Sequence, residues 1–309
     1  MRISFDGRVV IVTGAGAGLG RAYALELARR GAKLVVNDFG GRLDGSPASS
    51  GAAEATVAEI QAIGGEAIAD GADVTDESSV RSMVGNAVDK WGRIDALINN
   101  AGILRDAAFH KMSLADFRKV IEVHLMGSVN CTHAVWPIMR AANYGRIVMT
   151  TSSVGQYGNF GQANYAAAKM ALIGLMNTLV IEGAKVGIRV NAIGPGAATR
   201  MTEALIPKNI VALMTPESVA PAAVYLASDS APNRVILNAT AGGFSRTYIR
   251  ETVGVHLSGA DCSAEGLAAH FDAISDPTGE QLYLDGGQQV KKFVGRAAAA
   301  AGVDFSSGN

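Results

Sequence analysis

This sequence has few cysteines, almost equal numbers of acidic and basic residues, and no long apolar runs. Two cysteines in 309 residues cannot form a disulfide framework. Lysine and arginine number 27 against 28 aspartates and glutamates, so the chain lacks the basic surplus of a nucleic-acid-binding protein. Glycine, arginine, asparagine or aspartate interrupts every candidate run before it reaches the roughly 18 apolar residues of a membrane span. The sequence therefore indicates a soluble globular protein with neither nucleic acid nor membrane as a partner.

Targeting and metal-binding patterns are also missing. The first seven residues contain no apolar signal core, and the last three, Ser307–Asn309, differ from the Ser-Lys-Leu peroxisomal address. The expected location is the cytoplasm. The five histidines form no His-Glu-x-x-His pattern and no paired spacing with Cys131 or Cys262, so we expect no metal site.

Apolar runs alternate with segments of helical periodicity from residue 8 to about residue 230, which is the rhythm of β-α-β units around a parallel sheet. Most of the runs are rich in valine and isoleucine without alternation, as in strands covered on both faces. The expected strands are 8–13, 32–38, 66–73, 94–99, 146–152 and 187–193, and the expected helices are 18–30, 52–63, 76–90, 113–141 and 162–185. The sequence predicts an α/β fold with a Rossmann-type, doubly wound parallel sheet and a C-terminal elaboration.

The domain organisation follows from a shift in composition after Ser230. We expect a single domain over residues 1–309, with a core over 5–230 and a C-terminal extension over 231–309. A further apolar run, 281–284, is a candidate for one more strand of the sheet.

A glycine-rich segment, Thr13–Gly20, closes the first expected strand and opens a helical pattern. Small residues let the backbone turn tightly and approach a pyrophosphate, whose charge is favoured at a helix N-terminus. A purely structural strand-to-helix turn would also use glycine, but here an acid follows at the end of the second strand. We therefore expect dinucleotide binding, with contacts from Gly14, Gly16, Gly18, Leu19 and Gly20.

That acid is Asp38, which follows Gly14 by 24 residues, close to the spacing of about 20 for a ribose-binding carboxylate. A carboxylate there accepts hydrogen bonds from ribose hydroxyls and repels a 2′-phosphate. Ala15 and Ala17, at the positions that could pair with such a phosphate, carry no charge, whereas Arg42 lies four residues beyond Asp38. The sequence favours NAD over NADP.

Two further strand ends are candidates for cofactor contacts. Asp73 and Val74 follow the third strand and could hydrogen-bond adenine through side chain and backbone. Asn99, Ala101 and Gly102 follow the fourth strand and bring small residues near the cofactor. Residues of these types are also common in ordinary loops.

Tyr165 and Lys169 are four residues apart in a helical segment, so they share one face. A tyrosine can act as a general base only if its pKa falls from about 10, and a nearby ammonium favours the phenolate. Ser152 ends the fifth expected strand and could hydrogen-bond the reacting oxygen. On its own a Tyr-x-x-x-Lys pattern is usually a solvated helix face; with this serine and the dinucleotide motif it indicates a catalytic set.

These motifs resemble those of the short-chain dehydrogenase/reductase family over residues 5–230. Thr13–Gly20 resembles its cofactor motif and Asn99–Gly102 its strand-four motif. Its catalytic set is matched by Ser152, Tyr165 and Lys169.

The resemblance implies roles for further residues. Pro195 and Gly196 match the segment that closes over the nicotinamide, with Thr199 near its carboxamide. Tyr165 would take the hydroxyl proton as hydride passes to NAD. Lys169 would lower the pKa of Tyr165 and hold the nicotinamide ribose, and Ser152 would orient the substrate oxygen.

One position departs from the family pattern. The family usually has an asparagine in the middle of the long helix, where its backbone carbonyl holds a proton-relay water, and this chain has His124. A backbone carbonyl survives that change, so we expect the relay to persist. The alternative is a core histidine whose ring is satisfied.

Assembly is predicted from the two long helical segments, 113–141 and 162–185. Both carry apolar residues on more than one face, and one face must cover the sheet. The surplus indicates a helix–helix interface between subunits. The family resemblance implies the same, and we expect a homodimer or homotetramer.

Several segments narrow the resemblance to the (3R)-hydroxyacyl-CoA dehydrogenase portion of type 2 peroxisomal multifunctional enzymes. They are Val36–Gly41, Asn100–Asp106, Val123–Leu125, Tyr157–Tyr165 and Arg200–Thr202. Gly196, where that group tends to have asparagine, is a departure, and so is the lack of the hydratase and sterol-carrier portions. We therefore expect a stand-alone relative.

The resemblance implies NAD-dependent oxidation of (3R)-3-hydroxyacyl-CoA to 3-ketoacyl-CoA. The alternative substrate is a hydroxysteroid, or an acyl-CoA whose acyl group carries a steroid. A non-catalytic NADH-sensing module is a third possibility, which the intact set of Ser152, Tyr165 and Lys169 argues against.

Overall fold

The computed structural model describes residues 2–41, 51–198 and 207–305. The chain divides into two compact units, Met1–Thr247 and Tyr248–Asn309. The first unit contains the sheet and the candidate site, and its last strands extend past residue 230, where the expected core ends. A single domain over 1–309 stays a prediction.

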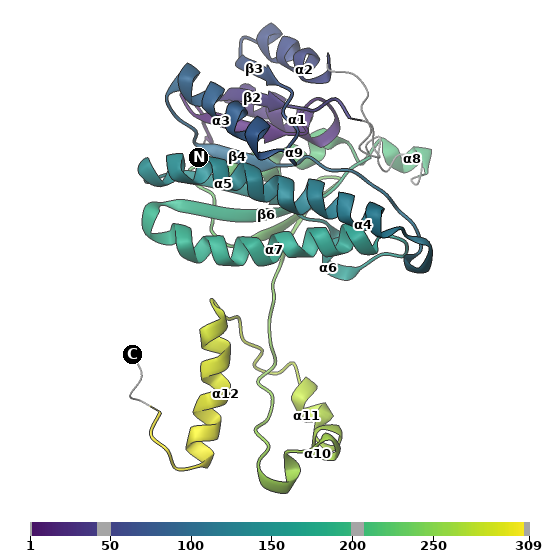
Figure 1. Cartoon of the computed structure of the whole chain (residues 1–309), viewed down its shortest axis with the longest axis vertical. Helices are drawn as coiled ribbons and strands as arrows, with labels where there is room; N and C mark the ends of the chain where they lie inside the picture. The colour runs from purple at the N-terminus through teal and green to yellow at the C-terminus, as the bar shows by residue number, and fades with distance from the viewer. Residues whose placement is uncertain (1, 42–50, 199–206, 306–309) are drawn as a thin grey trace. The chain divides into compact units, whose positions relative to one another are not determined.

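The first unit is built on an eight-stranded sheet with the strand order β3-β2-β1-β4-β5-β6-β7-β8 (Figure 1). Neighbouring strands are parallel from β3 to β7, and β8 pairs antiparallel with β7. The strands are β1 (Val9–Thr13), β2 (Lys33–Asn37), β3 (Glu66–Asp70), β4 (Ala96–Asn99), β5 (Gly145–Thr150), β6 (Ile188–Gly196), β7 (Ile236–Thr240) and β8 (Gly243–Thr247). This order confirms the predicted doubly wound Rossmann-type fold.

Helices cover both faces of the sheet (Figure 1). Those of this unit are α1 (Gly18–Ala28), α2 (Gly51–Ala62), α3 (Glu77–Trp91), α4 (Leu114–Ile121), α5 (Gly127–Ala141), α6 (Ser153–Tyr157), α7 (Ala163–Gly183), α8 (Lys208–Val211) and α9 (Pro216–Ala227). Short 3₁₀ turns are η1 (Phe109–Lys111) and η3 (Ala184–Val186), and a π-helical turn is η2 (Glu122–Met126).

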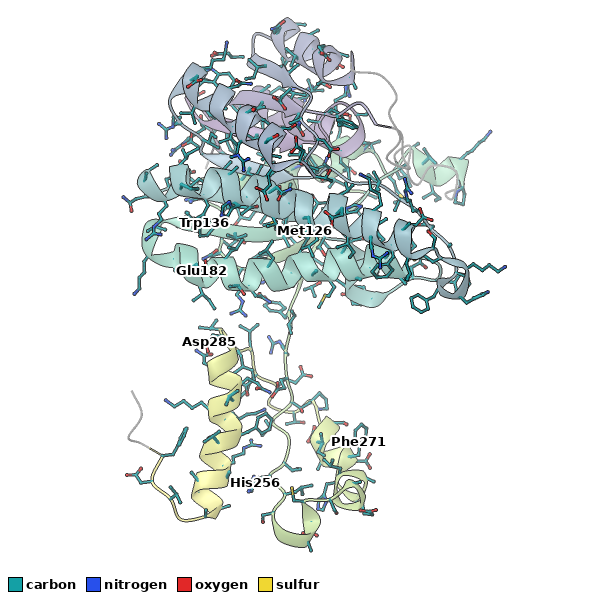
Figure 2. All side chains as sticks on the ribbon, in the orientation of Figure 1. Met126, Trp136, Glu182, His256, Phe271 and Asp285 are labelled. Carbon is teal, nitrogen blue, oxygen red and sulfur yellow. The ribbon has the colours of Figure 1, made fainter. Side chains whose placement is uncertain are left out.

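Alternate residues of the strands β1 to β7 enter two separate cores. In β1, Val10 and Val12 pack with α1, α2 and α9, whereas Val9 and Ile11 pack with α3, α5 and α7. The strands therefore need apolar residues at successive positions, as the sequence pattern indicates. Met126, Trp136 and Glu182, labelled in Figure 2, belong to η2, α5 and α7 on the second face.

Local sequence sets where the helices begin. Asp76, Ser113 and Thr215 are N-caps whose side chains accept hydrogen bonds from the first turns of α3, α4 and α9. The expected start at Ser113 is thus confirmed. Helix α1 differs, because its N-cap Ala17 provides no side-chain acceptor and its first turn holds no acid among the described residues. Its first amide groups are left for another partner.

Two expected elements differ in the structure. The expected helix 113–141 is interrupted by η2, where the Ser128 hydroxyl donates to the carbonyl of His124 at 2.7 Å. The expected strand at 281–284 is wrong: Gln281 makes one antiparallel bridge with Glu251, and the sheet is completed by β7 and β8.

Two stretches, Ala163–Val186 and Lys208–Ala227, are long and apolar enough in composition to cross a membrane, contrary to expectation. The first is α7 with its η3 extension, and α7 packs on the sheet. The second is broken between α8 and α9. The core helices of globular proteins meet the same criteria, so this is weak evidence for a span.

The second unit contains η5 (Gly259–Asp261), α10 (Ala264–Ala269), α11 (Phe271–Ser275) and α12 (Gly286–Ala300). Ser263 caps α10 by accepting from the amide of Gly266. Within this unit α12 is fixed to the segment 251–254, because Lys292 pairs with Glu251 at 2.5 Å and Arg296 donates to the carbonyl of Val253 at 2.8 Å.

Candidate active site

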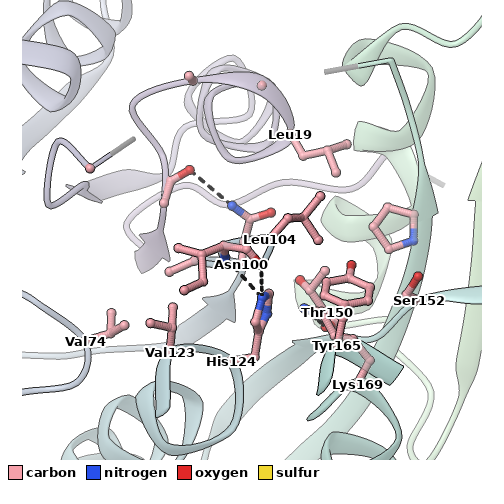
Figure 3. Close-up of a pocket in the computed structure, with 18 of the residues that line it drawn as sticks. Leu19, Val74, Asn100, Leu104, Val123, His124, Thr150, Ser152, Tyr165 and Lys169 are labelled. Carbon is pink, nitrogen blue, oxygen red and sulfur yellow. Dashed lines mark hydrogen bonds between the residues drawn. The ribbon is translucent and has the colours of Figure 1, made fainter. Parts of the chain in front are cut away.

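A pocket of about 590 Å³ lies at the carboxyl ends of β1, β2, β4, β5 and β6. Parallel sheets bind ligands at this edge, and β1 and β4 flank the point where the strand order reverses. The lining includes Asp38 after β2 together with Ser152 and Tyr165, and Figure 3 shows part of it with the last two labelled. The pocket therefore brings the expected cofactor and catalytic residues together.

The turn after β1 is packed too tightly to accept side chains. A Cβ on Gly14 would lie 2.9 Å from Ala101 Cα, and one on Gly20 would overlap the Gly14 carbonyl. Gly14 also has a φ of +64°, which favours glycine. Gly14, Gly18 and Leu19 line the pocket, whereas Gly16 and Gly20 serve this packing.

Asp38 fixes the turn from the neighbouring strand. Its two carboxylate oxygens accept hydrogen bonds from the backbone amides of Gly16 and Gly40, each at 2.8 Å. A Cβ on Gly16 would lie 2.7 Å from Asp38 Oδ2. Asp38 is thus held at the pocket edge with a defined orientation. Arg42 lies outside the described residues.

Asn100 is a residue that motif spacing alone did not select for the site. Its amide donates to the carbonyls of Thr13 and Gly14 at 2.9 and 3.1 Å, and its backbone N–H donates to Thr13 Oγ1 at 2.9 Å. The side chain therefore joins the ends of β1 and β4. The signal in the sequence that could have identified Asn100 is a second amide side chain, directly after Asn99, before the small residues Ala101 and Gly102.

The other predicted strand-end residues separate in the structure. Ala101, Gly102, Asp73 and Val74 line the pocket. Asn99 lies behind it, where its amide donates to Thr132 Oγ1 at 3.1 Å. The sequence placed Asn99 at the correct strand end but on the opposite side of the strand, because the direction of a side chain depends on the register of β4.

Asp73 and Val74 already accept hydrogen bonds from within the chain, which limits the acceptors that they can offer to adenine. Asp73 Oδ1 accepts from the backbone N–H and the hydroxyl of Thr75, both at 2.8 Å. The carbonyl of Val74 accepts from the Asn130 amide at 2.9 Å.

Ser152, Tyr165 and Lys169 converge on the same part of the pocket (Figure 3). Ser152 follows β5 and caps α6, accepting from the Val154 amide at 3.1 Å. Tyr165 and Lys169 come from α7 and lie on one face of it. The Lys169 Nζ is 5.5 Å from the centroid of the Tyr165 ring and donates to the Thr150 carbonyl at 2.6 Å.

Burial dominates the protonation of both α7 groups. It raises the pKa of Tyr165 above its usual value; a hydrogen bond with Ser152 opposes this rise, and the charge of Asp106 adds to it. Burial also lowers the pKa of Lys169 to about 7. Lys169 is therefore only partly protonated at neutral pH, and its expected effect on the pKa of Tyr165 stays a prediction.

His124, from η2, also lines the pocket. Burial and the charge of Lys169 hold its pKa well below the usual value, so the ring is neutral at physiological pH. The His124 carbonyl, which the sequence resemblance implies for a proton relay, accepts a hydrogen bond from the Ser128 hydroxyl.

The remaining expected contacts lie near the end of β6. Pro195 and Gly196 line the pocket, together with Met214, and Thr199 lies outside the described residues. Tyr157, the last residue of α6, and Phe160, on the loop that follows, are 75% and 88% exposed. Within the described ranges no group of three His, Cys, Asp or Glu side chains is placed to hold a metal ion.

The residues fit a dinucleotide. The uncapped N-terminus of α1 offers amides for a pyrophosphate beside a turn where side chains are excluded. Asp38 stands at the far end for a ribose. At the catalytic end Thr150 Oγ1 and His124 Nδ1 are buried polar atoms without a hydrogen-bond partner in the described chain. Such atoms are expected where a polar ligand or water binds.

Comparison with known proteins agrees with this geometry. The family profile for short chain dehydrogenases matches residues 8–209. A short-chain type dehydrogenase/reductase of Mycobacterium tuberculosis is 43% identical over 276 residues, which covers 89% of this chain and 96% of the relative. Short-chain dehydrogenases generally use NAD or NADP. A 7α-hydroxysteroid dehydrogenase solved with NADH and 7-oxo glycochenodeoxycholic acid has a TM-score of 0.70 at 32% identity. The match covers 78% of this chain and 95% of that one.

The peroxisomal multifunctional enzyme type 2 of Drosophila melanogaster is 50% identical over 257 residues, covering 83% of this chain. Its full-length structure has a TM-score of 0.80 at 37% identity and covers 96% of this chain and 50% of that one. The chain spans 42% of the length of that enzyme's sequence. Because such relatives are named peroxisomal, a cytoplasmic location stays a prediction.

Proposed function

Because the chain belongs to the short-chain dehydrogenase family, we propose that it oxidises the secondary alcohol of (3R)-3-hydroxyacyl-CoA to the 3-ketoacyl-CoA with NAD. One observation carries the proposal. Ser152, Tyr165 and Lys169 share a pocket with the glycine-rich turn and Asp38, so a reacting alcohol and a dinucleotide can meet there. Similarity to type 2 multifunctional enzymes supports the substrate class.

The chain's own residues supply the proton chemistry. Bound NAD would accept the hydride from the carbinol carbon. Ser152 would hold the substrate oxygen, and the phenolate of Tyr165 would take the hydroxyl proton, so that a ketone remains. Because burial raises the pKa of Tyr165, the hydrogen bond from Ser152 is the described interaction that favours the phenolate. Lys169, anchored on Thr150, would face the nicotinamide ribose.

Cofactor choice would rest on Asp38. Both of its oxygens are engaged by amides of the turn, which keeps a negative charge at the pocket edge. That charge accepts hydrogen bonds from ribose hydroxyls and repels a 2′-phosphate. NAD is therefore the proposed cofactor.

The substrate end of the pocket favours an acyl group. Leu104 and Met214 supply apolar surface beside Asn159 and Gln162. A thioether side chain adapts to acyl groups of different shape. A sugar would need more fixed polar partners. Other members of the fold act on steroids, so a hydroxysteroid is the competing substrate.

The test compares NAD reduction with four substrates: (3R)-3-hydroxyacyl-CoA, its (3S) isomer, the free 3-hydroxy acid and a free steroid alcohol. We expect the highest kcat/KM for the (3R) thioester, because contacts remote from the reacting carbon position the substrate. Equal rates with both isomers, or faster turnover of the steroid alcohol, would move the assignment to a hydroxysteroid dehydrogenase.

A further inference from the structure

The ring of His124 is fixed at one edge by the backbone of Ile103. Its Nε2 lies 2.8 Å from the Ile103 carbonyl oxygen and 3.1 Å from the Ile103 nitrogen. Whichever tautomer is present, the ring satisfies one of these two backbone groups. The side chain is only 2% exposed, so it has little freedom to leave this position.

The same ring contacts Tyr165. The two ring centroids are 5.1 Å apart and the planes are perpendicular, which is the edge-to-face arrangement that aromatic pairs prefer (Figure 3). Since the imidazole is neutral, it contacts the phenol without placing a cation beside it.

The surrounding backbone is shaped to receive this ring. A π-helical turn interrupts the helix at His124. Such turns are rare overall, and those that occur are often found at functional sites. A Cβ on Gly102 would overlap His124 Cε1 and lie 2.9 Å from Nδ1. Gly102 does not adopt a positive φ, so a side chain is excluded there by the ring and not by the backbone conformation.

We propose that His124 is a positioning residue for Tyr165: its ring, anchored on Ile103 and admitted by Gly102, holds the phenol where Ser152 can reach its hydroxyl. This role belongs to the ring and is separate from any role of the His124 carbonyl. It rests on the proposed function only in taking Tyr165 as the base. The other groups that act on the phenol are Ser152, Asp106 and Lys169.

Two substitutions separate the ring edge from its anchor. His124→Gln keeps a hydrogen-bonding terminus but removes the ring, and His124→Phe keeps the ring edge but loses the bond to Ile103. We expect His124→Gln to lower kcat by about tenfold or more, because small displacements of a reacting group are costly. His124→Phe should lose less. The Kd for NADH, measured by fluorescence titration, should change much less than kcat in both.

The pH profile distinguishes positioning from general packing. Without the ring the phenol would lose its hydrogen bond with Ser152, so the acid limb of the kcat profile should move to higher pH in His124→Gln. Val120→Ala is the matched control, because Val120 is buried in the same cluster that packs against Tyr165. It should lower Tm and leave the limb in place.

Gly102→Ala tests the steric argument. Alone, it should displace the ring and lower kcat as His124→Gln does. In the His124→Gln background it should cost little more, because the overlapping ring is gone. Fully additive losses of kcat in the double variant would contradict the proposal. So would a His124→Gln enzyme with wild-type kcat and an unmoved acid limb of its pH profile. A Val120→Ala variant whose acid limb moves as far as that of His124→Gln would also contradict it.

If the wild-type protein turns over none of the four substrates, the proposed function fails and the positioning role is still tested. The tyrosinate absorbance of the wild type minus that of Tyr165→Phe reports the titration of this phenol. The same difference in the His124→Gln background should titrate at higher pH. An unchanged titration would overturn the proposal.

Discussion

The ammonium nitrogen of Lys169 lies 2.6 Å from the carbonyl oxygen of Thr150, and the whole side chain is buried. Burial lowers its pKa to about 7, below the roughly 10.4 of an unfolded lysine. Between these two values the unfolded chain binds a proton that the folded chain does not. Wild-type stability therefore rises with pH across this window, by up to about 1.4 kcal/mol per pH unit.

Lys169→Met should abolish activity, because the proposed contact with the nicotinamide ribose is lost. It should also raise Tm at pH 7, because no buried ammonium has to lose its proton. The difference in Tm from the wild type should shrink as the pH approaches 10. Thermal unfolding of both proteins at several pH values measures this. Lys111→Met, at an exposed position, should show no such trend. An advantage that grew with pH would contradict the described protonation of Lys169.

Tyr165→Phe should keep the fold and the affinity for NADH, because the ring and its contact with His124 remain. Turnover should fall by about 10²–10⁴-fold, the usual contribution of a positioned acid–base group. Steady-state assays and an NADH titration measure the two effects separately. A variant that keeps more than about a tenth of the wild-type kcat would exclude Tyr165 as the base.

Asp38→Ser should raise the ratio of kcat/KM for NADP to that for NAD, because it removes the carboxylate that repels the 2′-phosphate. Adding Ala17→Arg should raise the ratio further by supplying a partner for the 2′-phosphate, since Ala17 lines the pocket. Ala17→Arg alone, with Asp38 present, should do less. A wild-type enzyme that already uses NADP as well as NAD would show that Asp38 does not set the preference.

Gly174→Lys should convert a dimer to a monomer. The exposed side of α7 includes Ala167, Met170, Gly174, Thr178 and Ile181 at helical spacing, all uncharged. A Cβ on Gly174 meets nothing within 4 Å in one subunit, so lysine fits the monomer and should disrupt only an interface.

Light scattering should give about twice 31.8 kDa for the wild type and 31.8 kDa for Gly174→Lys. Gly85→Lys on α3, where a Cβ also has open space, is the matched control and should leave the wild-type mass unchanged. A wild-type monomer at micromolar concentration would refute the expected interface.

The sequence by itself determined the alternation of strands and helices as far as β6, and the residues at the ends of those strands. Uninterrupted apolar runs such as 8–13 specify strands buried on both faces. Motif spacing places Gly14, Asp38 and Ser152 at the carboxyl ends of strands and Tyr165 on a helix that follows. Parallel strands share one edge, so local patterns suffice to gather these residues in one pocket.

Only the tertiary structure decided the finer contacts. The direction of Asn99, the amide partners of Asp38 and the anchor of Lys169 on Thr150 depend on register and on neighbours far along the chain. The π-helical turn at His124 leaves no signal in a helical pattern, because one extra residue per turn changes the periodicity too little. The fit between that ring and Gly102 arises where two segments meet, and neither segment encodes it alone.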